Sequence, residues 1–577
     1  MGLKNWIFKN WALFLYLMLS VFAILPFFDS GFFPIHDSVQ VTRVFEMAKS
    51  LSSGMFPVRW VADLGYGYGY PLFNFYSVPP YYMGGVLVLI GLSALFATKV
   101  VFVFAIILSG VSMYFFVKQF FGNLPALVSS LVYLYFPYHA VNIYVRGDLA
   151  ELFAYAFLPL VFLFLFKLHY LYREKSVEGK RAVFYILGLS LSLALVVISH
   201  NLSFFILMLF VVPLMVVSFL ISSSRKYLAF VYISSLSLAF LLSSFYAIPA
   251  VLEMGYTNVL SQVGGGAHYP DHFVCIGQLW DSVWGFGGST KGCLDGMSFR
   301  LGKVNIVFSI FSLAIYLFWY RKFKKTRFII NTSFLFLFVS TFMILPYSLF
   351  IWKLIPFVDF LQFPWRFLNI SGFFVSVTLG IFVFLISSII KESLKYLTVV
   401  FVALIILSTF YTNTKLFTFQ QQLFLDSNYF TSTENIKNIF SKISDEYLPS
   451  SFENKAPARE GGLIMVEVGK VDVLGFDDKR FNRLNIEIDA KTNSSFFVNR
   501  TFFPSWKTYV NGEKTNTFEK DGKVYFSLPK GEYSIDLILS ETKIEIVANI
   551  LSLIGIVTIV VVIISRRLDK FYAKKTS

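Results

Sequence analysis

Charge is scarce in this sequence. Only 14% of its 577 residues are charged, whereas 56% are hydrophobic and 19% are aromatic. About a quarter of the residues of a soluble domain are charged, so the composition excludes an ordinary soluble protein and indicates a polytopic membrane protein. The chain has only two cysteines, which excludes a disulfide-rich scaffold and a cysteine-cluster metal site. It also lacks a Walker loop, a nucleotide-binding glycine-rich turn and an HExxH motif, so neither an ATP-driven pump nor a zinc protease is indicated.

Long apolar runs, by contrast, are abundant. A helix needs about 20 mainly apolar residues to cross a hydrocarbon core of about 30 Å. Twelve runs meet this requirement: 10–28, 98–117, 124–142, 152–171, 182–199, 202–221, 227–249, 304–320, 328–346, 367–389, 396–411 and 544–565. A further run, 81–97, is ambiguous, and counting it as a span would reverse the orientation of every later helix.

The positions of Lys and Arg resolve this ambiguity. If 81–97 lies at the membrane interface, the segments on the side of the N-terminus hold 22 Lys and Arg but only 4 Asp and Glu, a balance of +18. The rest of the chain has a balance of −3, and the two together give the net charge of +15. Cytoplasmic loops are enriched in Lys and Arg. We therefore expect a plasma-membrane protein with both termini in the cytoplasm and residues 1–28 as an uncleaved anchor. The basic excess then reports topology and does not indicate nucleic-acid binding.

This topology predicts an all-α polytopic domain over 1–411 with four external loops, and an external domain over 412–543. The loops are 29–97, 143–151, 250–303 and 347–366. The segment 412–543 has the two-residue hairpin signal Asn511-Gly512 and short runs typical of strands, which together predict a small extracytoplasmic β-sandwich. These runs are 463–468, 483–489, 496–503, 507–510, 523–528 and 533–539. Residues 544–577 form the last span and a basic cytoplasmic tail.

Two features of the external loops predict local structure. Apolar residues at helical spacing over 41–48 predict a helix lying on the membrane surface, with Gln40, Arg43, Glu46 and Lys49 on the opposite, polar face. Cys275 and Cys293 share one external loop, where an oxidising compartment would permit a disulfide. Two unpaired cysteines that act as small hydrophobic residues are the alternative.

Polar residues of unusual type gather on the predicted external side of the membrane domain. They are His36, Asp37, Arg146, Asp148, Glu151, His200, Asn201, His268, Trp365 and Arg366. Most also have a structural explanation: Asp37 with Gln40, and Asp148 with Glu151, have the spacing of a helix capping box. His200-Asn201 fits a short turn, and Arg366 beside Trp365 fits an interfacial anchor. Capping does not explain Arg146.

The chemistry of this set favours transfer of a sugar from a lipid-linked phosphate. A carboxylate in the first external loop can act as a general base on an acceptor hydroxyl or hold a divalent cation. Arginine binds phosphate oxygens through its planar fork. A lipid-linked donor needs its phosphate held at the membrane surface, where these residues are expected.

Several motifs also carry a resemblance to known families. The chain resembles membrane proteins labelled 6-pyruvoyl-tetrahydropterin synthase-related in His36-Asp37 and in the segments YVRGDLAE (144–151), SHN (199–201), WGFG (284–287) and FPWRF (363–367). Residues 502–512 resemble the C-terminal domain of YfhO-like membrane proteins. Together with Pro79-Pro80-Tyr81-Tyr82 before the interfacial run, the organisation resembles GT-C-type membrane glycosyltransferases.

The GT-C resemblance implies an inverting glycosyltransferase acting at the extracytoplasmic face. The donor would be a polyprenyl-phosphate sugar, and the acceptor an envelope glycan, lipid or protein. Asp37 would be the catalytic acid of the first loop, and the remaining nine polar residues would bind substrate. Because His-Asp stands where paired acids are common in that family, the need for a divalent cation (Mg or Mn) stays open.

Three other activities can be weighed against this one. The pterin label would imply a soluble zinc enzyme with a histidine triad, but the six histidines include no close HxH pair, so that activity is not expected. A transporter of a lipid-linked or polar solute would favour broken helices in related halves and polar residues at mid-membrane, and the sequence shows no internal repeat. The third is a non-catalytic, glycan-binding scaffold.

Overall fold

The structure is a computed structural model that describes residues 10–171, 179–263, 267–453, 464–480 and 482–575. The chain forms two compact units: unit 1 comprises Met1–Asp37, Lys99–Phe240 and Val263–Phe424, and unit 2 comprises Ser38–Thr98, Leu241–Gln262 and Leu425–Ser577. Residues 1–9 and 172–178, which contribute to the predicted cytoplasmic segments, and residue 463 of a predicted strand lie outside the described residues.

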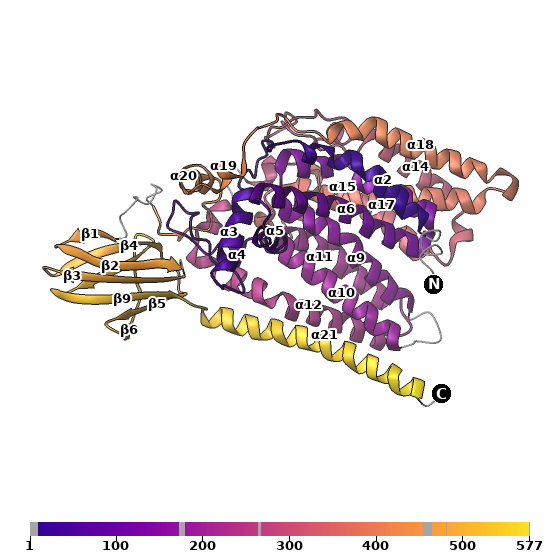
Figure 1. Ribbon diagram of the computed structural model, residues 1–577. Helices are drawn as coiled ribbons and strands as arrows, with labels where there is room; N and C mark the ends of the chain where they lie inside the picture. Colours follow the sequence, from indigo (N-terminus) through magenta and orange to yellow (C-terminus); the bar gives the residue numbers. More distant parts are fainter. Residues whose placement is uncertain (1–9, 172–178, 264–266, 454–463, 481, 576–577) are drawn as a thin grey trace. The chain divides into compact units, whose positions relative to one another are not determined.

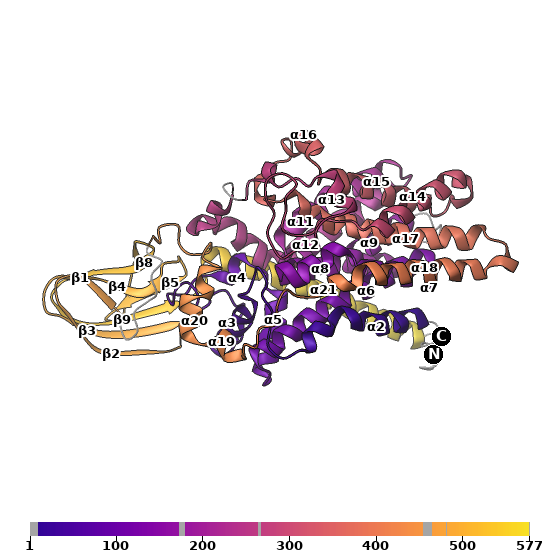
Figure 2. The same cartoon turned by 90° about the horizontal axis from the view of Figure 1, so that it is seen from above.

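Unit 1 is helical. Its helices, with α6 and α12 continuing into unit 2, are α2 (Trp11–Ile24), α6 (Ala94–Phe121), α7 (Asn123–Leu134), α8 (Pro137–Val141), α9 (Leu149–Leu171), α10 (Gly179–Ser199), α11 (Asn201–Leu220), α12 (Arg225–Leu252), α13 (Ile276–Trp280), α14 (Lys303–Phe318), α15 (Arg327–Phe342), α16 (Leu349–Trp352), α17 (Leu368–Ile389) and α18 (Tyr396–Asn413). The apolar helix α17 is buried along most of its length and packs against α7, α14 and α15 (Figure 2). It forms the centre of this unit.

The described residues confirm a polytopic helical fold. Nine helices are long and apolar enough to cross a membrane, two bent helix pairs raise that number to eleven, and α14 is a shorter apolar helix. Each of the twelve apolar runs overlaps one of these helices or bent pairs. The run 81–97 does not: α5 (Pro79–Leu89) has 11 residues and ends before α6 begins. At about 1.5 Å per residue it is too short to span.

Two predicted spans, 124–142 and 328–346, are bent helix pairs in the structure. The pair Asn123–Leu134 and Pro137–Arg146 bends by 41°, and Arg327–Phe342 and Pro346–Trp352 bend by 95°. The residues before the two prolines, Phe136 and Leu345, have extended backbones with ψ of 132° and 148°. A proline ring clashes with a helical residue before it, so each helix ends there.

Unit 2 combines short helices with a β domain and one long helix. Its helices are α3 (Gln40–Ser52), α4 (Leu72–Phe75), α5, α19 (Ser427–Thr431), α20 (Thr433–Asn438) and α21 (Lys543–Lys575). Helix α3 forms where the spacing predicted it. Three of the four residues on its polar face are buried, and the fourth, Lys49, pairs with Asp63. Gln40, Arg43 and Glu46 are 0%, 3% and 0% exposed. Arg43 Nη2 donates to Ser444 Oγ at 2.7 Å, so a segment about 400 residues away covers this face.

The β domain consists of two antiparallel sheets, most of whose strands are labelled in Figure 1. Their strand orders are β1-β4-β8-β7 and β2-β3-β9-β5-β6. The strands are β1 (Ile464–Val468), β2 (Val471–Arg480), β3 (Arg483–Ala490), β4 (Ser494–Thr501), β5 (Trp506–Val510), β6 (Glu513–Thr515), β7 (Phe518–Lys520), β8 (Lys523–Leu528) and β9 (Gly531–Leu539). Buried and exposed residues alternate along β3, as in a sheet with one covered face.

The hairpin signal in this domain is confirmed. Val510 pairs with Glu513, which leaves Asn511 and Gly512 as the loop, with φ of 51° and 81°. Two positive φ angles are what a two-residue loop of type I′ requires. The sequence did not predict β2 and β7, whereas β6 is the strand that the hairpin signal placed after Gly512.

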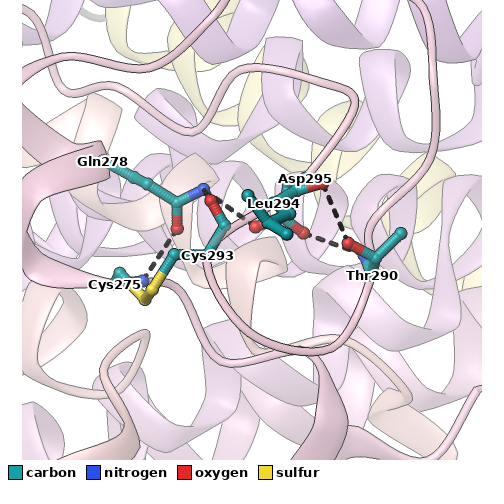
Figure 3. The surroundings of a disulfide bond; sticks show 6 residues. All are labelled: Cys275, Gln278, Thr290, Cys293, Leu294 and Asp295. Atoms are coloured by element: carbon teal, nitrogen blue, oxygen red, sulfur yellow. Dashed lines mark hydrogen bonds between the residues drawn. A yellow bond between two sulfur atoms is a disulfide. The ribbon is translucent and has the colours of Figure 1, made fainter.

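The structure also contains the disulfide between Cys275 and Cys293, with a Cα–Cα distance of 5.7 Å. Figure 3 shows Gln278 beside it. The Gln278 side chain accepts from the Cys275 N–H at 2.9 Å and donates to Asp295 Oδ2 at 2.8 Å. The bond and these contacts join the two ends of the loop that precedes α14.

Candidate functional site

The candidate site lies where the bent pair α7–α8 meets α9. The chain passes through the π-helical turn η2 (Asn142–Arg146) and then through Gly147, whose φ is 65°. A Cβ on Gly147 would lie 2.2 Å from Ile35 Cδ1, so a side chain is excluded by both backbone strain and close packing. π-Helical turns are rare and occur frequently at functional sites. Here the turn positions Arg146 directly before α9.

Arg146 is the centre of a buried ion-pair cluster. Its Nη2 lies 2.8 Å from Asp148 Oδ2, and its Nη1 lies 2.5 Å from Glu151 Oε2. The residue is 8% exposed. Asp148 Oδ1 also accepts from the backbone N–H of Glu151 at 2.9 Å, so the capping interpretation holds for Asp148. Capping and charge pairing thus coexist, and Arg146 pairs with both of the carboxylates that the turn brings together.

Glu151 is held by three further donors that the sequence did not single out. Its Oε1 accepts from Tyr138 Oη at 2.9 Å, Asn142 Nδ2 at 3.1 Å and Asn369 Nδ2 at 2.5 Å. A buried carboxylate needs such partners. Tyr138 lies about two helical turns before Arg146, and Asn142 lies one turn before it. Asn369 follows Arg366 by three residues. Helical spacing from the two arginines could therefore have identified all three donors.

The first external loop reaches this cluster through its backbone. The His36 N–H donates to Val145 O at 2.9 Å, and the Asp37 N–H donates to Arg146 O at 3.0 Å. His36 Nε2 also lies 3.1 Å from Phe286 O, so the WGFG segment meets the same loop. Helix α3 begins after Val39, which makes no side-chain cap, so Asp37 does not occupy the N-cap position that the predicted capping box requires. The structure thus brings Asp37 beside Arg146.

Trp365 and Arg366 arrive from the turn η9 (Pro364–Phe367) before α17. The Arg146 guanidinium lies over the Trp365 ring, 4.9 Å from its centroid, and Phe299 and Phe363 stack on that ring at 5.7 and 4.8 Å. Arg366 is 8% exposed and donates through Nη1 to Leu361 O at 3.3 Å. Trp365 Nε1 and Arg366 Nε are both buried without a hydrogen-bond partner. An unpaired buried donor costs about 1–3 kcal/mol.

His200 completes the cluster. It caps α11, and its Nδ1 lies 3.2 Å from the Ser203 N and 2.7 Å from the Ser203 Oγ. Ligand atoms of Asp148, Glu151 and His200 all lie within 4.8 Å of one another. Burial lowers the pKa of His200, although Asp148 and Glu151 oppose this. The neutral imidazole is therefore favoured.

The same three residues are the set that could hold a cation, Mg or Mn. Carboxylate oxygens suit both metals. Arg146, however, already binds one oxygen of each carboxylate, and its positive charge opposes a cation there. If Nδ1 of His200 accepts from the Ser203 N–H, the neutral ring carries its proton on Nε2 and has no lone pair left for a metal. The arrangement thus fits a cation poorly unless Arg146 and His200 rearrange.

Two predicted residues lie outside the cluster. Asn201 is exposed at the start of α11, and its Oδ1 accepts from the Leu202 N–H at 3.0 Å. His268 is also exposed, and its Nδ1 lies 3.4 Å from Asp271 Oδ2. The other eight converge through backbone or side-chain contacts.

The family comparison covers part of this site. Residues 73–264 match the family model of the 6-pyruvoyl-tetrahydropterin synthase related domain, described as a membrane protein. The resemblance to that group is thereby confirmed for the segment that contains Arg146, Asp148, Glu151 and His200. Asp37 and Arg366 lie outside it. No curated protein matches the chain.

Solved structures match at low identity. The oligosaccharyltransferase of Archaeoglobus fulgidus tethered with an acceptor peptide matches with 14% identity and a TM-score of 0.48, over 72% of this chain and 55% of that one. The same enzyme, AglB, with an inhibitory peptide and a dolichol-phosphate gives 14% and 0.46, over 71% and 56%. The arabinofuranosyltransferase AftD from Mycobacteria gives 12% and 0.44, over 71% and 26%. The chain thus spans about half the length of the first enzyme.

Proposed function

We propose that this protein is a membrane glycosyltransferase of the inverting GT-C type. It transfers a sugar from a polyprenyl-phosphate donor to an envelope glycan, lipid or protein at the extracytoplasmic face of the plasma membrane. The proposal is supported by residues from four separate segments that meet at one buried cluster, with Asp37 at its border. A purely structural role does not require two arginines, two acids and a histidine at one place.

The observation that carries the proposal is the pair of unpartnered donors at Trp365 Nε1 and Arg366 Nε. Both are N–H groups, so the missing partner is an acceptor, and a phosphate oxygen is a strong one. Arg146 was the expected phosphate ligand, but its Nη1 and Nη2 are engaged with Asp148 and Glu151. We therefore assign phosphate binding to Arg366 and positioning of the carboxylates to Arg146.

In the proposed reaction, Asp37 accepts the proton of the acceptor hydroxyl as its oxygen attacks the anomeric carbon. A bond forms between that oxygen and the carbon, and the bond between the carbon and the phosphate oxygen breaks. The polyprenyl phosphate leaves with the electron pair. Arg366 stabilises the negative charge that develops on the leaving phosphate.

The test is a transfer assay with full-length protein in lipid nanodiscs and a panel of polyprenyl-phosphate sugars. We expect sugar release or transfer from at least one donor. The Asp37→Asn variant should lower turnover by about 10²- to 10⁴-fold because the base is lost. Asp281→Asn, which removes an exposed carboxylate paired with Lys303, is the matched control and should keep full activity. Normal turnover in Asp37→Asn would remove Asp37 from the mechanism.

A further inference from the structure

A cavity in unit 2 is framed by the segment that follows α3, the β domain and the start of α21. Its volume is about 260 Å³, and its polar lining residues include Arg59, Asn74, Asn482, Glu541 and Glu545. None of them belongs to the Arg146 cluster. Sites for drug-sized ligands measure about 300–1,000 Å³, so this cavity suits a smaller group.

The floor of the cavity is a built polar site. Arg59 is 7% exposed, and its Nη1 and Nη2 donate to Asn74 Oδ1 at 2.7 Å and Asn549 Oδ1 at 2.8 Å. Asn74 Nδ2 in turn donates to Glu545 Oε1 at 2.7 Å. These contacts hold the Arg59 guanidinium in place through its Nη1 and Nη2 atoms. Arg59 Nε makes no hydrogen bond, although it lies 3.7 Å from Glu545 Oε1.

The unpartnered atoms of this cavity are of both kinds. Arg59 Nε is a buried donor, and Asn482 Oδ1 is a buried acceptor without a partner. An anion could satisfy only the donor, and a cation only the acceptor. A hydroxyl group both donates and accepts. The unmet polar atoms thus match a ligand that carries several hydroxyls.

Charge and the apolar rim favour the same class of ligand. The charged lining residues are one arginine and two glutamates, so the cavity does not attract phosphate. Phe56, with 79% of its surface exposed, and Met55 and Pro57 also line it. A sugar ring has an apolar C–H face that can pack on such a rim while its hydroxyls reach the polar floor.

We propose that this cavity binds one ring of a saccharide. Glu545 lies in the first turn of the candidate membrane span Lys543–Ser565, so the cavity lies at the end of a membrane helix. The ring can therefore come from a glycolipid head group or from a soluble glycan that reaches the membrane surface. This binding role is independent of the proposed transfer reaction, because it uses neither Asp37 nor Arg366.

The test measures binding to the full-length protein in nanodiscs. The soluble probes are methyl glycosides of glucose, galactose, mannose, rhamnose, arabinofuranose and N-acetylglucosamine, followed by saturation-transfer NMR. In a second arm, glucosyl- and galactosyl-diacylglycerol are incorporated into the nanodiscs. Binding in the first arm identifies a soluble source, and binding in the second alone identifies a lipid source. Binding of inorganic phosphate or phosphocholine in place of every sugar would overturn the proposal.

Two variants locate the binding. Asn482→Leu removes the unpartnered acceptor at similar volume, and we expect saccharide binding about tenfold weaker, since each lost hydrogen bond costs roughly 3- to 10-fold. Phe56→Ala removes an exposed ring and should weaken binding to a similar degree. Phe518→Ala, at a ring of 60% exposure outside the cavity lining, is the control and should bind normally. Unchanged affinity in both cavity variants, with folding intact, would exclude this cavity as the site.

Discussion

At the residue scale, the two buried arginines of the candidate site differ in how their donors are used. Arg146 gives Nη1 and Nη2 to two carboxylates, whereas Arg366 Nη1 bonds a backbone carbonyl and its Nε has no partner. The sequence could identify both residues, because arginine near a membrane span is unusual. It could not assign their roles, because these depend on which carboxylates surround Arg146 in three dimensions. Glu151, one of these carboxylates, is itself held by Tyr138, Asn142 and Asn369.

This difference predicts opposite outcomes for the two conservative substitutions. Arg146→Lys keeps one charge but cannot hold both carboxylates through a fork, so it should lower the free energy of unfolding by about 1–3 kcal/mol. Its KM for the donor should change little. Arg366→Lys should raise the donor KM about tenfold while the melting temperature stays near that of the parent. Thermal unfolding and steady-state kinetics on both variants separate the roles, and the reverse pattern would exchange them.

The same pairing bears on metal dependence. Because Arg146 already occupies one oxygen of Asp148 and one of Glu151, we expect donor binding and transfer to persist after treatment with EDTA. The measurement is activity with EDTA, and again after Mg²⁺ or Mn²⁺ is restored. An activity that disappears with EDTA and returns with either ion would show that a cation displaces Arg146 from the carboxylates.

At the element scale, proline and long-range burial explain where the sequence succeeded and where it did not. The apolar runs predicted the spans because their length alone is informative. The bends before Pro137 and Pro346 were within reach of the sequence, since a residue preceding proline avoids the helix. The burial of the polar face of α3 was not, because its partner Ser444 is separated by about 400 residues and no local pattern reports it.

That buried face predicts a pH dependence. Burial, together with Asp63, raises the pKa of Glu46 to about 8, although Lys49 opposes this. The pKa of an unperturbed glutamate is 4.5. Above that pH the Glu46 side chain loses its proton in the unfolded state but keeps it in the folded state. Stability should therefore fall as pH rises from about 5 to 8, by at most about 1.4 kcal/mol per pH unit. Below this range the contribution is fully present.

Glu46→Gln tests this dependence, because glutamine is neutral at every pH. We expect its melting temperature to change less between pH 5 and 9 than that of the parent, with the largest gain at high pH. Glu434→Gln, at an exposed position of α20, serves as the matched control and should follow the parent. Parallel curves for the parent and Glu46→Gln would show that Glu46 is ionised in the folded protein.

At the scale of the whole molecule, the fold does not define which side of the membrane each loop lies on. The distribution of Lys and Arg along the chain predicts it. The helices establish that the chain is polytopic, and the short α5 removes the run that would have reversed every later helix. The side on which each loop lies stays a prediction, which rests on the 22 Lys and Arg in the predicted cytoplasmic segments. The same orientation would give the Arg146 cluster and the β domain access to extracytoplasmic substrates.

Cysteine labelling of intact cells tests this orientation directly. The two natural cysteines form a disulfide and do not react with a maleimide. A cysteine at Lys514, exposed on β6, should therefore be modified by a membrane-impermeant maleimide, whereas one at Lys324, exposed between α14 and α15, should stay protected until the cells are permeabilised. Labelling at Lys324 in intact cells, with Lys514 protected, would show that the predicted orientation of the chain in the membrane is reversed. The transfer reaction and its lipid-linked donor would then have to be sought at the cytoplasmic face.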